Sequence, residues 1–183
     1  MADGGASTII MLVTALLISS AASAVLIQEW AATSRAIQQQ QEGLQVSEQI
    51  SIDFAGDPMM VELSTATNPN EIHFYLLNSG SHTLKHSNAG GDVYLTVFVQ
   101  GVLLDETSID ADFVPLFNED TNTFQTPTQW EPNVMMEISL SHTSFNDFSD
   151  QDNIKLYVTA RSNEVSGLSM STSMSEEVRL HEV

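Results

Sequence analysis

Histidines spaced for metal binding are the first candidates for chemistry in this chain. Of its five histidines, His82 and His86 are four residues apart, a spacing that on a helix would turn both rings to one side and allow them to hold a metal ion. Gly80, Asn88 and Gly90-Gly91 surround them and predict a turn rather than a helix. We therefore expect surface histidines and no metal site.

Clustered acidic residues are the second candidates. Oxygen-rich loops suit calcium and magnesium, but neither cluster follows the alternating pattern of a calcium-binding loop. A solvated acidic face is the simpler interpretation, and a bound cation, detectable as a calcium-dependent rise in melting temperature, stays as the alternative. The two clusters are Asp105-Glu106 with Asp110 and Asp112, and Asp147 with Asp150 and Asp152.

No motif of an enzyme is present. The chain has no cysteine, no G-x-S-x-G or S-x-x-K sequence and no phosphate-binding glycine loop, and Ser79 in Asn-Ser-Gly-Ser lacks the strand-to-helix context of a nucleophile. We predict no catalytic residue, no cofactor and no enzymatic activity. A hydrolase whose acid, base and nucleophile come from distant segments stays open as an alternative, and it would require a concave polar pocket.

The charge restricts the choice of partner. Against 24 acidic residues there are only five bases, and the net charge is −19. The first 30 residues contain two acids, Asp3 and Glu29, and no base. The remaining residues therefore carry a net charge of −17. Such a surface repels nucleic acid, which we exclude as a partner. It also stays hydrated in concentrated salt, which suggests a saline source.

The first thirty residues predict a membrane anchor. Residues 4–27 carry no charge, and residues 6–27 as a helix would reach roughly 33 Å, enough to cross a hydrocarbon core of about 30 Å. We assign residues 1–5 to a short cytoplasmic head and 6–28 to a transmembrane helix. A cleaved signal ending at Ala22-Ser23-Ala24 is the alternative, but no basic residue precedes the apolar run, which continues past that point.

Orientation and packing of this helix follow from its surroundings. A short head before it and a large acidic domain after it favour a cytoplasmic N-terminus and a C-terminal domain outside the cytoplasm. Trp30 lies where interfacial aromatic residues anchor helices. Ala15, Ser19 and Ser23 recur every fourth residue, a spacing that allows close helix packing in lipid; a span without a partner is the alternative.

A polar helical stalk is predicted over residues 29–48. Trp30, Ile37 and Leu44 are seven apart, but the complementary heptad positions are polar, so a helix resting on its own domain or on a neighbour fits better than a coiled coil. Gly43 is a possible end of the helix.

Alternating apolar residues from Gln49 onward predict strands. We expect an all-β immunoglobulin-like β-sandwich over residues 49–175 and a tail over 176–183, with Asn78 to Ser81 as a structural turn. The predicted strands are antiparallel and lie at residues 50–54, 60–64, 72–77, 93–99, 101–105, 134–140, 154–160 and 165–171.

A sandwich without a catalytic motif predicts function through its surface. Strand edges and outward apolar residues are the natural contact points for other proteins. Tyr94, Phe98 and Met135 occupy such outward positions, with burial against the second sheet as the alternative, more so for Phe98 than for Met135.

The order of these parts resembles the FlaG (ArlG) family of archaellum accessory proteins. The resemblance rests on an apolar N-terminal helix, Gly43-Leu44 in the stalk, Asp53-Phe54 to Asp57-Pro58, and the stretches HFYLLNSGSHTL, DVYLTVFVQG and QWEPNVMMEISL. The last two are also similar to the sister family FlaF (ArlF), so an S-layer-binding FlaF-type chain is one alternative. A longer loop, which we expect between Asp105 and Trp130, and the Ser/Met-rich tail depart from the family.

The resemblance implies a non-catalytic part of the motor's stator, anchored in the archaeal cell membrane for swimming motility. Its partners would be FlaF, the S-layer protein and the archaellin filament, in a homo- or hetero-oligomer. The second alternative is a pilin- or archaellin-like filament subunit. Such subunits carry a basic residue before the apolar helix, which Met1-Ala2-Asp3-Gly4-Gly5 lacks, so we expect no processing there.

Overall fold

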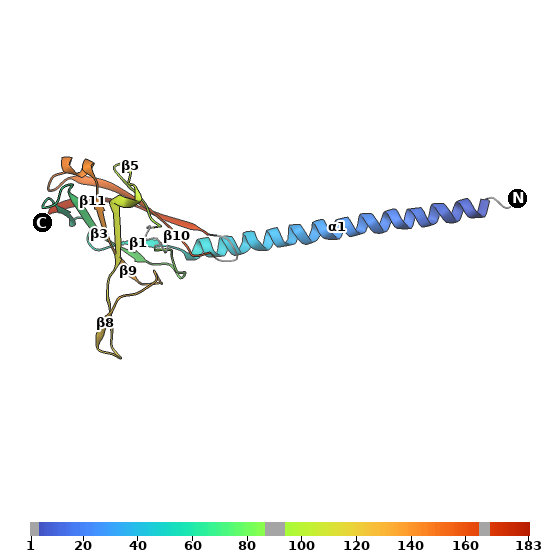
Figure 1. The fold of residues 1–183 in the computed structure, drawn as a ribbon, viewed down its shortest axis with the longest axis horizontal. Helices are drawn as coiled ribbons and strands as arrows, with labels where there is room; N and C mark the ends of the chain where they lie inside the picture. Colours follow the sequence, from blue (N-terminus) through green and yellow to red (C-terminus); the bar gives the residue numbers. More distant parts are fainter. Residues whose placement is uncertain (1–3, 87–93, 165–168) are drawn as a thin grey trace. The chain divides into compact units, whose positions relative to one another are not determined.

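The computed structural model describes residues 4–86, 94–164 and 169–183 (Figure 1). The chain divides into two compact units, Met1–Glu42 and Gly43–Val183. The first unit is helical, whereas the second contains the end of the same helix and every strand of the described residues.

A single helix, α1 (Gly4–Gln49), forms the N-terminal part of the chain. Its 46 residues contain no proline, and they are rich in alanine, leucine and glutamine, which favour helices. The helix passes through Gly43, where the sequence suggested that it could end, and stops at Gln49. The long helix that the sequence predicted is therefore present and unbroken.

Apolar side chains cover every side of the first half of α1. The large apolar residues from Ile9 to Ile27 are exposed whichever way they point, so this part of the helix has no polar side. Among the described residues, α1 is the one helix long and apolar enough to cross a membrane, over Ser7–Leu44, and none of its apolar window is buried. Water cannot stably cover such a surface.

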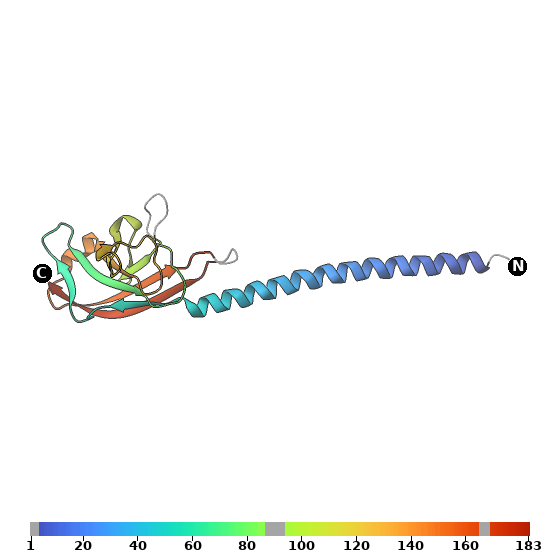
Figure 2. The same ribbon diagram turned by 90° about the horizontal axis from the view of Figure 1, so that it is seen from below.

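The second unit is built on one curled nine-stranded sheet. Eight strands follow the order β5-β4-β10-β11-β2-β3-β9-β6, and β1 pairs with β3. Figures 1 and 2 show from two directions how the sheet folds over on itself. The strands are β1 (Ile52–Ala55), β2 (Val61–Ser64), β3 (Glu71–Asn78), β4 (Thr96–Val99), β5 (Val102–Leu103), β6 (Ile109–Phe113), β9 (Met135–Ser141), β10 (Asn153–Arg161) and β11 (Ser171–Glu182).

Alternation along the strands creates the core. In β10, Ile154, Leu156 and Val158 are buried while Lys155 and Tyr157 face outward. In the nine-stranded sheet, the inward residues of every strand except β5, whose two residues are exposed, join in a single apolar cluster. This arrangement confirms the predicted β-sandwich after an N-terminal helix. The immunoglobulin-like connection of its strands stays a prediction.

The last strand runs further than the sequence suggested. β11 ends at Glu182, inside the segment that we had assigned to a tail, and Val178 and Leu180 are buried in the core. Its end pairs parallel to β2, with Leu180 opposite Val61, so the sheet is not purely antiparallel as predicted. Most of the strand predicted at residues 165–171 lies outside the described residues.

The segment between Asp105 and Trp130 is structured rather than a long loop. It contains a short 3-10 helix η1 (Glu106–Ser108), strand β6 and a separate two-stranded sheet of β7 (Leu116–Asn118) and β8 (Thr123–Gln125). In β6 the buried residues Ile109 and Ala111 alternate with aspartates, which rarely occur in strands and so concealed the pattern. A second 3-10 helix, η2 (Thr143–Asp147), buries Phe145.

A buried asparagine joins three segments at the end of β3. The Asn78 side chain is fully buried, and its amide nitrogen donates hydrogen bonds to the carbonyl oxygens of His82 and Trp130, each at 2.9 Å. Its carbonyl oxygen accepts a hydrogen bond from the backbone N–H of Gly80 at 3.1 Å. Asn78 thereby shapes the turn at residues 78–81 and holds it against the segment around Trp130.

This turn holds the C-terminal end of α1. The backbone N–H of Ser81 donates to the carbonyl oxygen of Gln49 at 2.7 Å, and the N–H of Gly80 donates to that of Ser51 at 3.2 Å. A Cβ atom at Gly80 would lie only 2.5 Å from the Gln49 carbonyl oxygen and 2.6 Å from the Ser51 nitrogen. Only glycine allows this approach. We call the contact between the turn and Gln49 the helix junction.

We predict that Asn78→Ala destabilises the second unit by about 2 kcal/mol, because the buried carbonyl of Trp130 and the partly buried carbonyl of His82 each lose a donor and a small gap opens beside Trp130. Denaturant unfolding of the detergent-solubilised full chain measures the loss. Asn153→Ala is the matched control, since Asn153 is exposed on β10, and it should change the stability far less. Equal stabilities of the two variants would contradict the role of Asn78.

Candidate interaction surfaces

The residues predicted for helix packing all lie on the exposed part of α1. Ala15, Ser19 and Ser23 are exposed, and the Ser23 hydroxyl donates a hydrogen bond to the Ser19 carbonyl oxygen at 2.8 Å. A hydroxyl satisfied within its own helix can enter lipid at low cost. The Trp30 side chain is 77% exposed. Packing at the first three residues and anchoring at Trp30 stay predictions.

The two histidines singled out by spacing have structural partners. The Nε2 atom of His82 lies 2.8 Å from the side-chain oxygen of Gln49, at the helix junction. His86 bonds through Nε2 to the carbonyl oxygen of Ala111 at 2.7 Å and stacks against Phe113. No group of three metal-binding side chains occurs in the parts of the chain that the structure describes. The two rings serve local structure.

Acidic residues of the second cluster cap nearby backbone groups. Asp150 accepts a hydrogen bond from the N–H of Glu182 at 3.1 Å and lies 3.3 Å from Nδ1 of His181. The first of these contacts, helped by Gln151 and His181, lowers the pKa of the Asp150 carboxyl below its ordinary 3.8. Asp152 accepts from the N–H of Ser149. Asp150 fastens the end of β11 to the loop before β10, and Asp152 stabilises that loop.

The outer face of β2, β3, β9 and β6 is acidic. Asp112 stands opposite Glu137, which in turn stands opposite Tyr75. Desolvation and the negative charge of Glu137 raise the pKa of the Tyr75 hydroxyl. Tyr75 is exposed on this face, and Leu77 and Met135 are half-buried on it. We call it the acidic face and define it by Glu62, Asp110, Asp112, Glu137 and Tyr75.

The outer face of β5, β4, β10 and β11 has the opposite character. Leu103, Phe98 and Tyr157 stand side by side on three neighbouring strands, and the rings of Phe98 and Tyr157 meet edge to face at 5.8 Å. Lys155 and Arg161 lie on the same side of β10 as Tyr157. We call these five residues the basic aromatic face. Phe98, which the sequence placed either outward or in the core, faces outward and is half-buried.

Two cations of this face form no ion pair among the described residues. Lys85 lies 3.9 Å from Glu164 and over the Tyr94 ring, and Arg179 donates to the Gln151 side chain. In the described parts of the chain, no carboxylate lies within ion-pair distance of Lys155 or Arg161. Glu177 nevertheless stands directly opposite Lys155 on β11, on the same outer face of the sheet.

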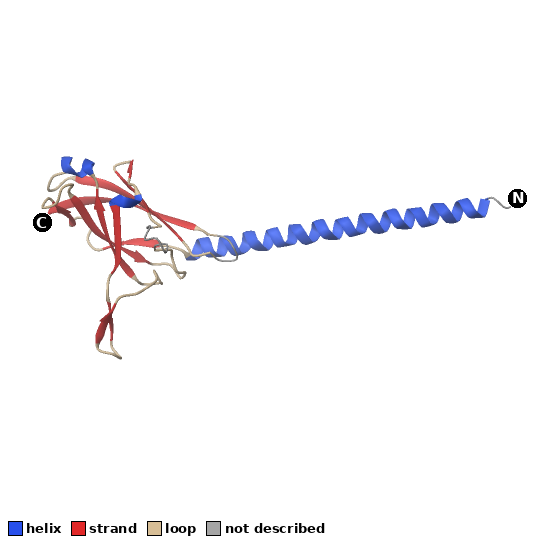
Figure 3. Cartoon of the chain, viewed as in Figure 1, coloured by secondary structure: helices blue, strands red, loops and turns tan. Residues whose placement is uncertain are grey.

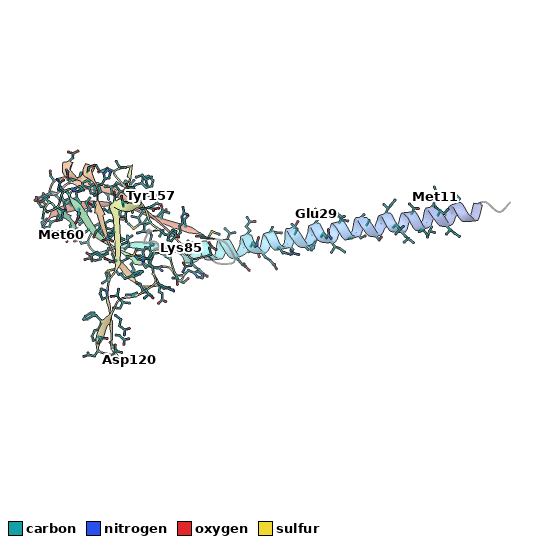
Figure 4. All side chains as sticks on the ribbon, viewed as in Figure 1. Met11, Glu29, Met60, Lys85, Asp120 and Tyr157 are labelled. Carbon is teal, nitrogen blue, oxygen red and sulfur yellow. The ribbon has the colours of Figure 1, made fainter. Side chains whose placement is uncertain are left out.

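A hairpin with exposed aromatic rings projects from the second unit. Strands β7 and β8 form it, and Figure 3 shows it standing apart from the main sheet. Phe117 and Phe124 face each other across the two strands at 5.3 Å and are 52% and 72% exposed. The turn between the strands carries Glu119 and Asp120, and Figure 4 labels Asp120 at the tip. We call residues 116–125 the arm.

Sequence reasoning missed the arm and named other surface residues. Tyr94 is exposed beneath Lys85, and Met135 is half-buried on β9. A signal for the arm was present, because Leu-Phe-Asn and Thr-Phe-Gln flank the turn-forming stretch Glu-Asp-Thr-Asn. Both strands have only three residues, too few for an alternating pattern to stand out.

A hollow of about 570 Å³ lies at the base of the arm. Leu116, Phe117, Pro127 and Val134 supply its apolar lining, and Glu119 and Glu131 are the ionisable residues among those that line it. Amide and hydroxyl side chains complete a lining that is as polar as it is apolar.

Comparison with known proteins yields a family match. The model of the archaeal-type flagellin family matches residues 2–167. No curated protein matches the chain. Among solved structures, AggA, the major subunit of aggregative adherence fimbriae type I from Escherichia coli, is similar at 14% identity over 73% of this chain and 94% of that chain, with a TM-score of 0.27.

We predict that Asp150→Asn lowers the melting temperature at neutral pH. Because the folded-state pKa of Asp150 is depressed, its ionised form stabilises the fold above about pH 3.8, and this contribution is lost as the pH falls through the lower folded-state pKa. The difference between the variant and the natural chain should therefore shrink in acid. Thermal unfolding from pH 7 to pH 2.5 measures it.

Asp120→Asn is the control, since Asp120 is exposed at the tip of the arm and should leave the melting temperature unchanged at every pH. A difference for Asp150→Asn that stays constant down to the lowest pH would contradict the assignment.

Proposed function

This chain belongs to the archaeal-type flagellin family, and we propose that it is a stationary, membrane-anchored structural subunit of the archaellum rather than part of its rotating filament. The family is one of structural proteins without enzymatic activity, and its members belong to the archaellum. The stationary role and the partners proposed below go beyond the family match.

The length of the exposed apolar part of α1 carries this proposal. The uncharged stretch ends at Ile27, and the roughly 33 Å that residues 6–27 span matches a bilayer core of about 30 Å. Trp30 follows at the level of the head groups. Beyond it α1 turns polar, with Glu29, Arg35 and a run of glutamines. A single bilayer crossing would place the apolar half of α1 in lipid and the polar half in water.

The second unit suits a place outside the cytoplasm, with the N-terminus inside. Its acidic surface stays hydrated at high salt. Within this unit the helix junction ties the last turn of α1 to the turn at residues 78–81.

Its partners would be other structural proteins of the envelope. We propose a FlaF-type sister subunit, with the S-layer protein and the archaellin filament as further contacts, on the strength of the family resemblance in the sequence. In the membrane, Ala15, Ser19 and Ser23 would let a second helix approach α1 closely.

A filament subunit is the second candidate function. The match to the archaeal-type flagellin family favours it, because an exposed apolar helix can also be covered by copies of itself in a filament core. The two candidates differ in where the protein resides in the cell, and a fractionation experiment separates them.

Cells that carry archaella and express the full chain are sheared, and the filaments and membranes are separated and probed for the protein. We expect it in the membrane fraction, released by detergent and not by high salt. Accumulation in sheared filaments in amounts comparable to the main filament protein would overturn the stationary role and establish the second candidate.

We predict that Leu17→Arg strongly reduces membrane association. An arginine at the centre of the bilayer is less favourable than leucine by about 3 kcal/mol on the insertion scale. Gln39→Arg, in the polar half of α1, is the matched control and should leave the membrane fraction unchanged. Membrane flotation of the two variants measures the difference, and equal flotation would contradict a buried position for Leu17.

A further inference from the structure

We propose that His86 and Asp110 close the free edge of β6, so that this end of the main sheet does not accept a further strand. The closure is an inhibitory contact built into the fold. It goes beyond the proposed function and does not rest on it, because it concerns one strand edge wherever the protein resides.

Strand β6 lies at one end of the nine-stranded sheet. It pairs with β9 on one side, and within residues 4–86, 94–164 and 169–183 no strand pairs with its other side. An exposed edge presents unpaired N–H and C=O groups, to which another strand can add. At the opposite end of the sheet, β5 has only two residues, which is too short an edge for such pairing. The five residues of β6 therefore form the edge that requires protection.

The pairing with β9 decides which backbone groups of β6 point to the free edge. The N–H of Val114 donates to the carbonyl oxygen of Met135 at 3.1 Å, across the two strands. In an antiparallel pair, alternate residues direct both of their backbone groups to the neighbouring strand. The even-numbered residues of β6 therefore bond to β9. The residues whose backbone groups face the free edge are Ile109, Ala111 and Phe113.

Ala111, in the middle of this edge, has both of its backbone groups occupied. Nε2 of His86 lies 2.7 Å from the Ala111 carbonyl oxygen, and because a carbonyl only accepts, the ring donates through an N–H at Nε2. The N–H of Ala111 donates to Oδ1 of Asp110 at 3.1 Å. A strand that paired with Ala111 would have to break both hydrogen bonds.

The edge is restricted on either side of Ala111 as well. The N–H of Ile109 donates to the carbonyl oxygen of Glu106 in η1. The His86 ring packs against the Phe113 ring, with a centroid distance of 4.4 Å. The imidazole therefore lies alongside the edge and takes up space that an added strand would need.

A purely local role for the two side chains predicts a different result. If their hydrogen bonds served only to stabilise the segment, their loss would lower the melting temperature without exposing an edge. Strand addition and stability are therefore measured separately.

Cysteine crosslinking of the full chain in detergent tests the closure, because the natural sequence contains no cysteine. Asp112→Cys places an exposed thiol on β6. If two β6 edges paired antiparallel about Ala111, position 112 of one copy would lie beside position 110 of the other, which brings the two thiols within reach of a short bismaleimide. The second copy serves here as a probe strand.

We expect little dimer from the chain that carries Asp112→Cys alone. Adding His86→Ala should raise the dimer yield about fivefold, the factor that corresponds to one hydrogen bond of ordinary strength. His82→Ala is the matched control, because His82 is also half-buried but bonds to the Gln49 side chain and not to a strand edge. A yield with His86→Ala no higher than with His82→Ala would overturn the proposal.

Substitutions of Asp110 separate hydrogen bonding from charge repulsion. Asp110→Ala frees the Ala111 N–H and should raise the dimer yield, whereas Asp110→Asn keeps an acceptor oxygen and should not. An equal rise with both variants would show that charge alone keeps strands apart, and it would overturn the role of the hydrogen bonds.

General unfolding is controlled with Asn78→Ala, which is expected to weaken the fold without touching β6. Melting temperatures are measured for each variant beside its dimer yield. A yield with Asn78→Ala equal to that with His86→Ala would show that instability exposes the thiol, and it would overturn the closure. These yields do not depend on cellular location, so their failure leaves the fractionation result unaffected.

Discussion

The apolar surface of α1 is the constraint on which the rest of the molecule depends. From Ile9 to Ile27 the large side chains are exposed all round the helix, and no charge interrupts them. Leaving that area in water costs far more than the marginal stability of a domain can offset. The helix must therefore be covered by lipid or by other helices. This requirement explains why the strands build a core of their own.

The second unit has a hydrophobic core of its own, formed by the strands of its sheet. Its inward residues form one apolar cluster, so the fold does not rely on the apolar half of α1. At the helix junction, Gly80 brings the turn onto Gln49, and Asn78 holds the same turn against the Trp130 segment. Local hydrogen bonds of this kind make a firm link between a helix end and a domain, as a structural subunit needs.

Sequence patterns gave the coarse architecture because they record periodicity. The uncharged run before Trp30 marked the apolar helix, and the alternation around Leu156 marked a strand. The sequence did not predict that β11 extends to Glu182, because Val178 and Leu180 supply too few apolar positions to indicate a strand. The arm was not predicted because each of its strands has only three residues, too few to show an alternating pattern. The position of Glu177 opposite Lys155 depends on how β10 and β11 pair, which no local pattern contains.

The most direct test of the membrane account is the depth of α1 in a bilayer, measured by quenching of tryptophan fluorescence with lipids brominated at known positions. The full chain and its Trp30→Phe variant are compared to isolate Trp30, and Leu17→Trp is then added to that variant. Our account predicts that Trp30 is quenched best by bromine near the head groups and the tryptophan at position 17 by bromine near the bilayer centre. Shallow quenching at both positions, or none at either, would contradict it.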